Sequence, residues 1–283
     1  ALVVTAASLN TALVPNANLV LSGTGGTRTL AITPATNQFG PATITVTVSD
    51  GTNTTSDTFL LTIRAVNDPP TLSSISSRSV NEDISTGPLA FTVADIETSG
   101  SNLVVSAFSS DTNLVPNANI TLAIVSGGTN RTVNVLPGTN QFGTVSISIR
   151  VADTDGAVVS NSFQLTINAV NDPPTLNPIS DLTANEDSGP ATVALTGVSP
   201  GATNEIQDLL ITATSGNPGL IPSVSVNYTP GAATGSLSFT PVANSNGVAT
   251  ITVTATDDGS SNNVTVRTFN VTITAVNDPP VIS

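Results

Sequence analysis

The sequence predicts an all-β protein, a linear tandem array of seven-stranded β-sandwiches. The block Ala-Val-Asn-Asp-Pro-Pro occurs at 65–70, 169–174 and 275–280. The copies lie roughly 100 residues apart, which is the size of one small sandwich domain. Between them, short runs of alternating apolar residues are separated by Gly, Pro, Asn and Asp, a pattern typical of strands and turns. We therefore interpret the block as the joint between consecutive domains.

Composition supports strands and argues against an enzyme. The 283 residues are 39% hydrophobic but only 3% aromatic, so the cores must be built from Val, Ile, Leu, Ala and Thr methyl groups, which pack well on pleated sheets. The chain has no Cys, His or Lys, which removes disulfides, the thiol nucleophile, the common general base and Schiff-base chemistry. Paired carboxylates can hydrolyse glycosides, but here the acids gather at the joints. We predict no enzymatic activity.

The net charge of −13 indicates which partners suit the chain. An acidic surface repels nucleic acid and anionic membranes, so we expect neither as a partner. No apolar run approaches the ~20 residues that cross a bilayer, so we expect no membrane insertion in this segment. Hard cations are the natural partners of such a surface.

Residues 71–174 are predicted to form one complete repeat. Its apolar runs predict strands at 71–76, 88–94, 103–109, 120–125, 132–136, 145–152 and 162–169. Residues 175–280 follow the same plan as a complete but divergent repeat, and residues 281–283 are expected to begin the next one.

Residues 1–70 are expected to form an incomplete repeat. The motif LVPNAN at 13–18 and 114–119, and TNQFG at 36–40 and 139–143, align this unit with the middle one. In that alignment the chain starts at the third strand, so two strands are missing, which would leave apolar side chains and backbone groups unpaired. Two interpretations stay open: a piece of a longer array, or strands shared between neighbouring subunits by β-augmentation.

Acidic residues cluster in the loops that lead to the joints. They lie in the joint itself, in two Asn-Glu-Asp triplets, in the loop after the second strand and in the last hairpin. Carboxylates gathered in this way repel one another unless a cation neutralises them. Ca²⁺ accepts six to eight oxygen ligands in a tolerant geometry, so we predict Ca²⁺ as the bound ion.

The order of these motifs resembles a cadherin repeat. The resemblance rests on Val80-Asn81-Glu82, Ala94-Asp95-Ile96-Glu97, Val151-Ala152-Asp153 and Val170-Asn171-Asp172-Pro173. The whole chain is similar to the cadherin-like, immunoglobulin-like tandem repeats of very large bacterial extracellular surface proteins. The resemblance implies that the linker and both flanking domains share ions. It assigns Asn67, Asp68, Asp95, Glu97 and Asp153 to the first joint, and Glu82, Asn171, Asp172 and Asp257 to the second.

The sequence also departs from that pattern. Where cadherins carry an acidic motif before the sixth strand, this chain has Asn140-Gln141-Phe142-Gly143 and Asn244-Ser245-Asn246-Gly247. We expect Phe142, like Phe39 in the first unit, to plug the end of the core. Because Pro200 and Gly201 occupy the region of the second acidic motif, Glu205 is not expected to reach the second joint. The first joint is thus the better predicted site, the second is expected to bend, and affinities of ~10⁻⁴ to 10⁻³ M are expected.

Simpler interpretations of the same residues need no metal. Asp68 and Asp172 are candidates to start Asx-turns before a rigid Pro-Pro pair. Glu82 and Asp83 fit solvated turn acids, and residues 153–156 fit a hairpin turn.

These features together predict a structural role outside the cell. We expect a segment of an extracellular or cell-surface rod, stalk or filament, with Pro-Pro joints stiffened by Ca²⁺ and with strand sharing between subunits as one of the two open interpretations of the first repeat. Its partners would be neighbouring repeats, copies of itself, or cell-surface and matrix components. The alternative is an adhesin or carbohydrate-binding module. The single Tyr and the absence of Trp leave few aromatic platforms for sugars.

Overall fold

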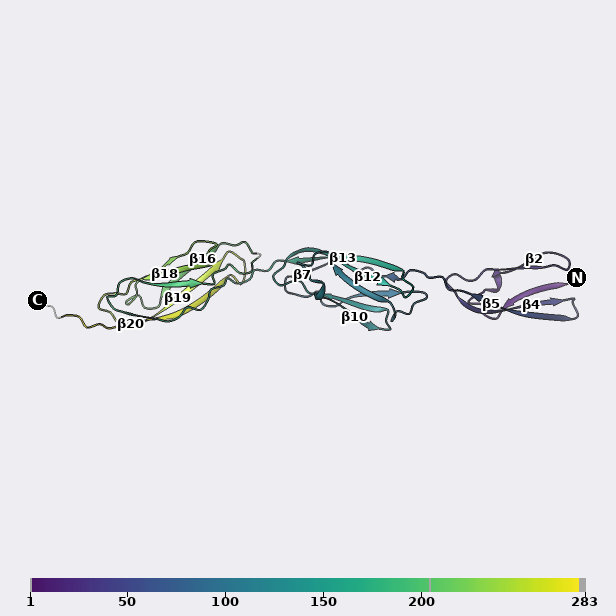
Figure 1. The fold of residues 1–283 in the computed structure, drawn as a ribbon, viewed down its shortest axis with the longest axis horizontal. Helices are drawn as coiled ribbons and strands as arrows, with labels where there is room; N and C mark the ends of the chain where they lie inside the picture. The colour runs from purple at the N-terminus through teal and green to yellow at the C-terminus, as the bar shows by residue number, and fades with distance from the viewer. Residues whose placement is uncertain (1, 204, 280–283) are drawn as a thin grey trace. The chain divides into compact units, whose positions relative to one another are not determined.

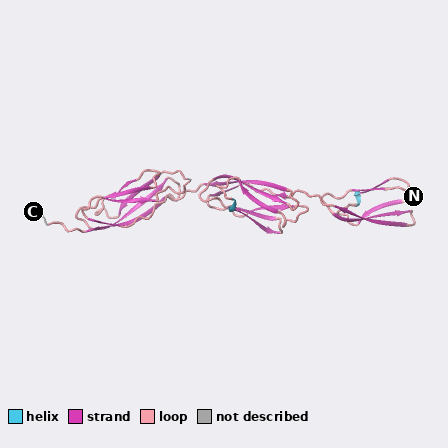
Figure 2. Cartoon of the chain, in the orientation of Figure 1, coloured by secondary structure: helices cyan, strands magenta, loops and turns pink. Residues whose placement is uncertain are grey.

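A computed structural model describes residues 2–203 and 205–279, and almost all of its regular structure is β-strand (Figure 2). The all-β prediction is confirmed. Residues 281–283, predicted to begin a further repeat, lie outside the described residues. The helices among the described residues are two 3₁₀ turns, Asn16–Asn18 and Asn117–Asn119, and neither could cross a membrane.

The chain divides into two compact units. Unit 1 comprises Ala1–Arg78, Thr86–Val135 and Val145–Leu165, and unit 2 comprises Ser79–Ser85, Leu136–Thr144 and Thr166–Ser283. The predicted domains 1–70, 71–174 and 175–280 are called the first, middle and third sandwich below, and their boundaries stay predictions. The joint at 65–70 and the residues assigned to it lie in unit 1, and those of the joint at 169–174 lie in unit 2.

The first sandwich contains five strands (Figure 1). They are β1 Val3–Ser8, β2 Leu19–Ser22, β3 Thr29–Ile32, β4 Gly40–Ser49 and β5 Thr54–Ile63. One sheet has the order β1-β4-β5 and the other pairs β2 with β3.

The middle sandwich contains eight strands. They are β6 Thr71–Leu72, β7 Arg78–Asn81, β8 Leu89–Ala94, β9 Val104–Ser109, β10 Ile120–Ser126, β11 Asn130–Val135, β12 Gly143–Ala152 and β13 Val158–Asn168. The sheet orders are β10-β11-β8-β6 and β7-β13-β12-β9. Of the strand predicted at 71–76, the structure forms only the two residues of β6, and β7, which joins the other sheet, was not predicted.

The third sandwich repeats this plan. Its strands are β14 Leu182–Asn185, β15 Ala191–Thr196, β16 Leu209–Ser215, β17 Ser225–Asn227, β18 Thr234–Phe239, β19 Gly247–Asp257 and β20 Val264–Thr274. The sheet orders are β14-β20-β19-β16 and β15-β18-β17. β14 is an edge strand of its sheet and runs parallel to its neighbour β20.

The first sandwich has a small core. Its buried hydrophobic cluster consists of Leu13, Val14, Ala42 and Ile44. Phe59 of β5 is 44% exposed, whereas Phe163, in the matching Phe-x-Leu-Thr-Ile stretch of β13, is 4% exposed. The expected exposure of an apolar side chain in this unit is therefore observed at Phe59.

The aromatic residues of the two NQFG loops do not plug a core. Phe39 and Phe142 are 46% and 42% exposed, so that prediction is wrong. In β4 the buried residues are Ala42 and Ile44, and in β12 they include Ile147. Because side chains alternate between the two faces of a strand, each Phe has the outward register.

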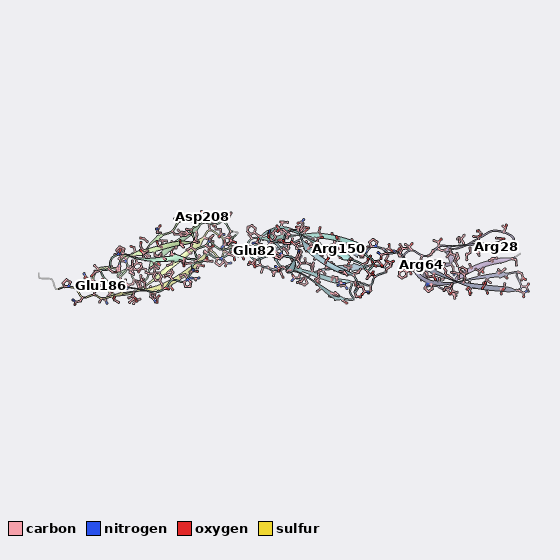
Figure 3. All side chains as sticks on the ribbon, viewed as in Figure 1. Arg28, Arg64, Glu82, Arg150, Glu186 and Asp208 are labelled. Carbon is pink, nitrogen blue, oxygen red and sulfur yellow. The ribbon has the colours of Figure 1, made fainter. Side chains whose placement is uncertain are left out.

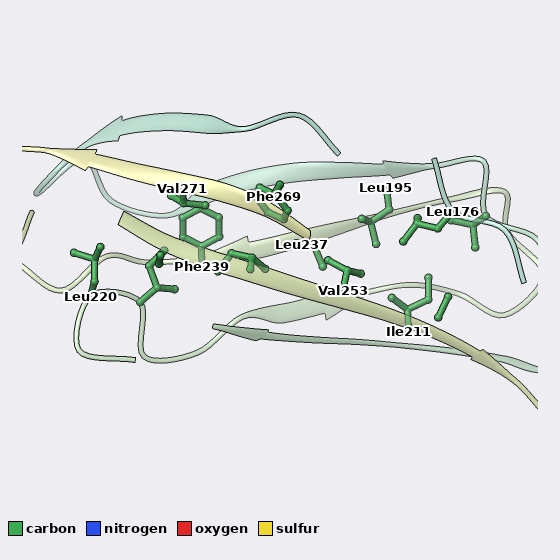
Figure 4. Packing of buried hydrophobic residues seen from close by; sticks show 14 of the residues in the cluster. Leu176, Leu195, Ile211, Leu220, Leu237, Phe239, Val253, Phe269 and Val271 are labelled. Atoms are coloured by element: carbon green, nitrogen blue, oxygen red, sulfur yellow. The ribbon is translucent and has the colours of Figure 1, made fainter. Parts of the chain in front are cut away.

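The third sandwich has an extensive core. Figure 4 shows Leu195, Leu237 and Phe239 facing Val253 and Phe269 across the two sheets. These side chains are 5% exposed or less. Apolar burial therefore stabilises this sandwich without any disulfide.

We predict that Leu237→Ala destabilises the third sandwich by about 2 to 5 kcal/mol, because it leaves a cavity at a fully buried site. Leu210→Ala, at a β16 position that is 63% exposed, is the matched control and should change stability by less than about 0.5 kcal/mol. Scanning calorimetry of the whole chain measures both. Equal losses in the two variants would contradict the assigned core.

Candidate metal centre

Carboxylates hold the linker backbone at the first joint. The backbone N–H of Asp68 donates to Glu97 Oε2 at 3.1 Å, and Asn67 Nδ2 donates to Asp153 Oδ2 at 2.9 Å. Both bonds lie within unit 1. All four residues come from the set assigned to this joint, so the structure brings them together in two pairs.

Asp153 is a buried carboxylate with several donors. Its Oδ1 accepts from the backbone N–H groups of Asp155, Gly156 and Ala157 at 2.6 to 3.0 Å. The pKa of Asp153 is lowered, first by the Asn67 amide and then by backbone N–H groups, against the opposing effect of burial. This loop is a turn closed by the bond from Asp153 N to Ala157 O, so the hairpin-turn interpretation is confirmed.

Asp95 has one satisfied oxygen and one without a partner. Its Oδ1 accepts from the N–H groups of Glu97 and Thr98 at 2.9 and 2.6 Å. Its Oδ2 is buried and has no hydrogen-bond partner among the described residues. A buried, unpartnered carboxylate oxygen is costly, and a cation is one means of satisfying it.

Glu205 reaches the second joint, contrary to the prediction. The N–H of Asp172 donates to Glu205 Oε1 at 3.0 Å, as Asp68 does to Glu97 at the first joint. The N–H of Ala202 holds Oε2 at 3.2 Å. Gly201 makes this approach possible, because its φ is +151° and a Cβ there would lie 2.7 Å from the Asp172 carbonyl oxygen.

Glu82 is a buried acid and not a solvated one. It is 4% exposed, so the solvated-turn interpretation is wrong for this residue. Its Oε1 accepts from Val170 N–H at 2.5 Å, while Oε2 is buried without a partner among the described residues. Burial, the largest cause, raises the pKa of Glu82, as do the charges of Asp172, Asp83 and Glu205, whereas the Val170 N–H lowers it.

The side-chain amides of Asn171 and Gln207 form further hydrogen bonds at the second joint. Asn171 Nδ2 donates to Ser261 O at 2.8 Å and lies 3.4 Å from Asp257 Oδ1. Gln207 Nε2 donates to Asn171 Oδ1, which leaves Gln207 Oε1 buried without a partner in the described part of the chain. Sequence analysis missed Gln207. The spacing Glu205-x-Gln207, like Asp95-x-Glu97, was the available signal.

Asp172 lies among other acids. Its Oδ2 is buried and unpartnered within the described residues. Burial raises the pKa of Asp172, and the charges of Glu205 and Asp83 raise it further. No group of three or more His, Cys, Asp or Glu in residues 2–203 and 205–279 lies close enough together to hold a metal ion. A ligand set at either joint would therefore have to include amide or backbone oxygens.

The Asx-turn interpretation of the joint is wrong. An Asx-turn needs the N–H of the residue two positions after the Asp, and Pro70 and Pro174 have none. Asp172 Oδ2 accordingly has no partner.

The Asn-Glu-Asp triplets form the same arrangement in two sandwiches (Figure 3 labels Glu82 and Glu186). Glu186 accepts from Val276 N–H at 2.9 Å, as Glu82 does from Val170. The following Asp83 and Asp187 both have φ of 60°. Their Oδ1 atoms accept from the N–H groups of Asn140 and Asn244 at 3.0 and 3.2 Å. Each triplet is thus hydrogen-bonded both to its linker and to the loop that precedes β12 or β19.

Comparisons with known proteins give low similarity. No family model and no curated protein matches the chain. The protocadherin gammaB7 EC3-6 cis-dimer structure is 17% identical, with a TM-score of 0.48, over 96% of this chain and 65% of its own. Mouse protocadherin-24 EC1-3 is 16% identical, with a TM-score of 0.40, over 96% and 90%. The titin domains z1z2 in complex with telethonin are 12% identical, with a TM-score of 0.33, over 75% and 100%. At these values the similarities assign no function.

In the presence of a chelator, we predict that the melting temperature of unit 2 falls as the pH rises from 4.5 to 7. The folded-state pKa of Glu82 is raised above its ordinary value of 4.5, so its contribution to stability is present below pH 4.5 and is lost as the pH rises through the folded-state value. Glu82→Gln removes this titration but keeps an acceptor for Val170 N–H. Calorimetry at several pH values should therefore show a smaller fall in the variant. An equal fall in both proteins would contradict the assignment.

Proposed function

We propose that this chain is a structural segment of an extracellular rod, stalk or filament whose joints Ca²⁺ stiffens. The observation that carries the proposal is the set of buried oxygens without hydrogen-bond partners beside the linkers. They belong to Glu82, Asp95, Asp172 and Gln207. Buried polar atoms normally have a partner, and these are oxygens, the ligands that Ca²⁺ prefers.

At the second joint, Glu82 and Asp172 would hold the ion through their unpartnered oxygens, together with the Gln207 amide oxygen. The raised pKa values of Glu82 and Asp172 support this set, because each carboxylate is disfavoured by burial and by its acidic neighbours. Bound Ca²⁺ would supply the positive charge that the described side chains lack there. One oxygen of Glu82 already accepts a hydrogen bond from the linker N–H of Val170. An ion bound at the other oxygen would therefore restrict the same linker segment.

At the first joint, Asp95 and Glu97 would bind an ion more weakly, together with amide or backbone oxygens. One buried carboxylate oxygen lacks a partner there, on Asp95, whereas Asn67 already satisfies Asp153. We therefore reverse the expected order of the two joints and propose that the second is the stronger site. The reversal follows from the buried oxygens without partners, which belong to Glu82, Asp172 and Gln207 at the second joint and to Asp95 alone at the first, among the described residues.

Ca²⁺ that binds only the folded chain stabilises it by linkage. For dissociation constants of ~10⁻⁴ to 10⁻³ M, 10 mM Ca²⁺ should add about 1.4 to 2.7 kcal/mol relative to chelator. Calorimetry should show an increased melting temperature for the unit 2 transition. Small-angle scattering should show a narrower distribution of maximum dimensions, since an ion restricts the linker.

Asp172→Asn should abolish most of the gain in unit 2, because the side chain loses its negative charge. Asp57→Asn is the matched control, since Asp57 is exposed on β5 and its carboxylate accepts from the N–H of Thr58. A Ca²⁺ response that survives Asp172→Asn, or no response in the unchanged chain, would refute the Ca²⁺ part of the proposal.

A further inference from the structure

The middle sandwich has an opening between strands β9 and β10. Ile124 and Leu122 of β10 pair with Arg131 and Val133 of β11, so all four share the face that points into the sandwich. Val133 is fully buried on that face, yet Ile124 is 57% exposed. β9 and β10 are the edge strands of different sheets on this side. Inward-facing apolar side chains are therefore left uncovered.

The third sandwich is closed at the corresponding place. Val105 of β9 pairs with Val151, two residues before Asp153, and Ile211 of β16 pairs with Ala255, two residues before Asp257. Ile211 is 6% exposed, whereas Val105 is only partly buried. The opening is thus a property of the middle sandwich and not a general feature of this fold.

The opening leads to a cavity of about 280 Å³ that lies within unit 1. It is lined by Phe91, Val105, Leu122, Ala123, Ile124 and Arg131. Five of these residues are apolar and one is charged. The volume is close to the lower end of the range for small-molecule sites, about 300 to 1,000 Å³, which consist of apolar walls and a few polar groups.

Arg131 is the charged group of this cavity and is itself 9% exposed. Its hydrogen bonds all go to backbone carbonyl oxygens: Nε to Gly128 at 2.8 Å, and Nη2 to Gly100 at 2.8 Å and Leu103 at 3.4 Å. These neutral acceptors fix the guanidinium but do not neutralise it. No carboxylate is among its partners in the described chain, and no bond from Nη1 is found there.

The charge and shape of the cavity select one class of ligand. A buried cation without a counter-ion is unfavourable, and the Nη1 group of Arg131 remains to donate a charge-assisted hydrogen bond to a carboxylate. The remaining walls suit an aliphatic body. We propose that the middle sandwich binds a short, single-chain organic carboxylate, with its chain between β9 and β10 and its carboxylate on Arg131. This site is independent of the joints and of the proposed structural role.

Isothermal titration of the whole chain with octanoate tests this site in the presence of chelator. We expect one saturable site per chain, and binding of 1-octanol at least about tenfold weaker because it cannot form the charge-assisted pair with Arg131. Arg131→Gln should reduce octanoate affinity to that of octanol. Heat that does not saturate, or equal affinity for the two ligands, would overturn the proposal.

A matched pair of variants on β9 keeps the test decisive if Arg131→Gln does not fold. Val105→Phe places a larger side chain in the cavity and should abolish octanoate binding. Val104→Phe, at the adjacent position that is 63% exposed, should bind as the unchanged chain does. Equal binding by both variants would refute the site. Sedimentation velocity tests the alternative that a second copy of the chain covers the opening. If the unchanged chain is a dimer that Val105→Phe dissociates, and octanoate does not bind, the proposal is overturned in favour of that alternative.

Discussion

The hydrogen bond from a linker N–H to a buried or half-buried carboxylate is the interaction on which the joints depend. An Asn-Asp-Pro-Pro linker has few backbone donors, because proline has no N–H. The sandwiches bind the donors that remain: Glu82 accepts from Val170, Glu97 from Asp68, and Glu205 from Asp172. Hydrogen bonds to charged acceptors are stronger than those between neutral groups. Each of these bonds therefore strongly restricts the path of the linker beside its sandwich.

The same bonds place carboxylates where water reaches them poorly. A carboxylate has two oxygens, and a linker N–H satisfies only one of them. At the first joint, the Asn67 amide satisfies an oxygen of Asp153, and the pKa of Asp153 is lowered. At the second joint, Glu82 and Asp172 each keep a buried oxygen without a partner, and their pKa values are raised. This difference is the physical basis for proposing the second joint as the stronger cation site.

The middle and third sandwiches have different residues at the position where the core is closed. The third places Leu237, which is fully buried and pairs with Val193 of β15, within a continuous apolar cluster. The middle sandwich instead places Arg131 on an inward-facing position of β11, where Val133 and Val135 follow as buried residues. Apolar side chains cannot neutralise the charge of an arginine at that position, and the opening lies beside it.

The sequence by itself determined the strands and turns of this protein, because the period-two alternation and the turn residues act locally. The predicted strands at 88–94, 103–109 and 145–152 correspond to β8, β9 and β12 within about two residues at each end. The resemblance to cadherin motifs also assigned to the first joint the four residues that the structure pairs there. Tertiary structure alone decided the burial of Glu82 and Arg131, the reach of Glu205, and the role of Gln207. Those properties depend on segments distant in sequence, which pack at one place only when the sheets form.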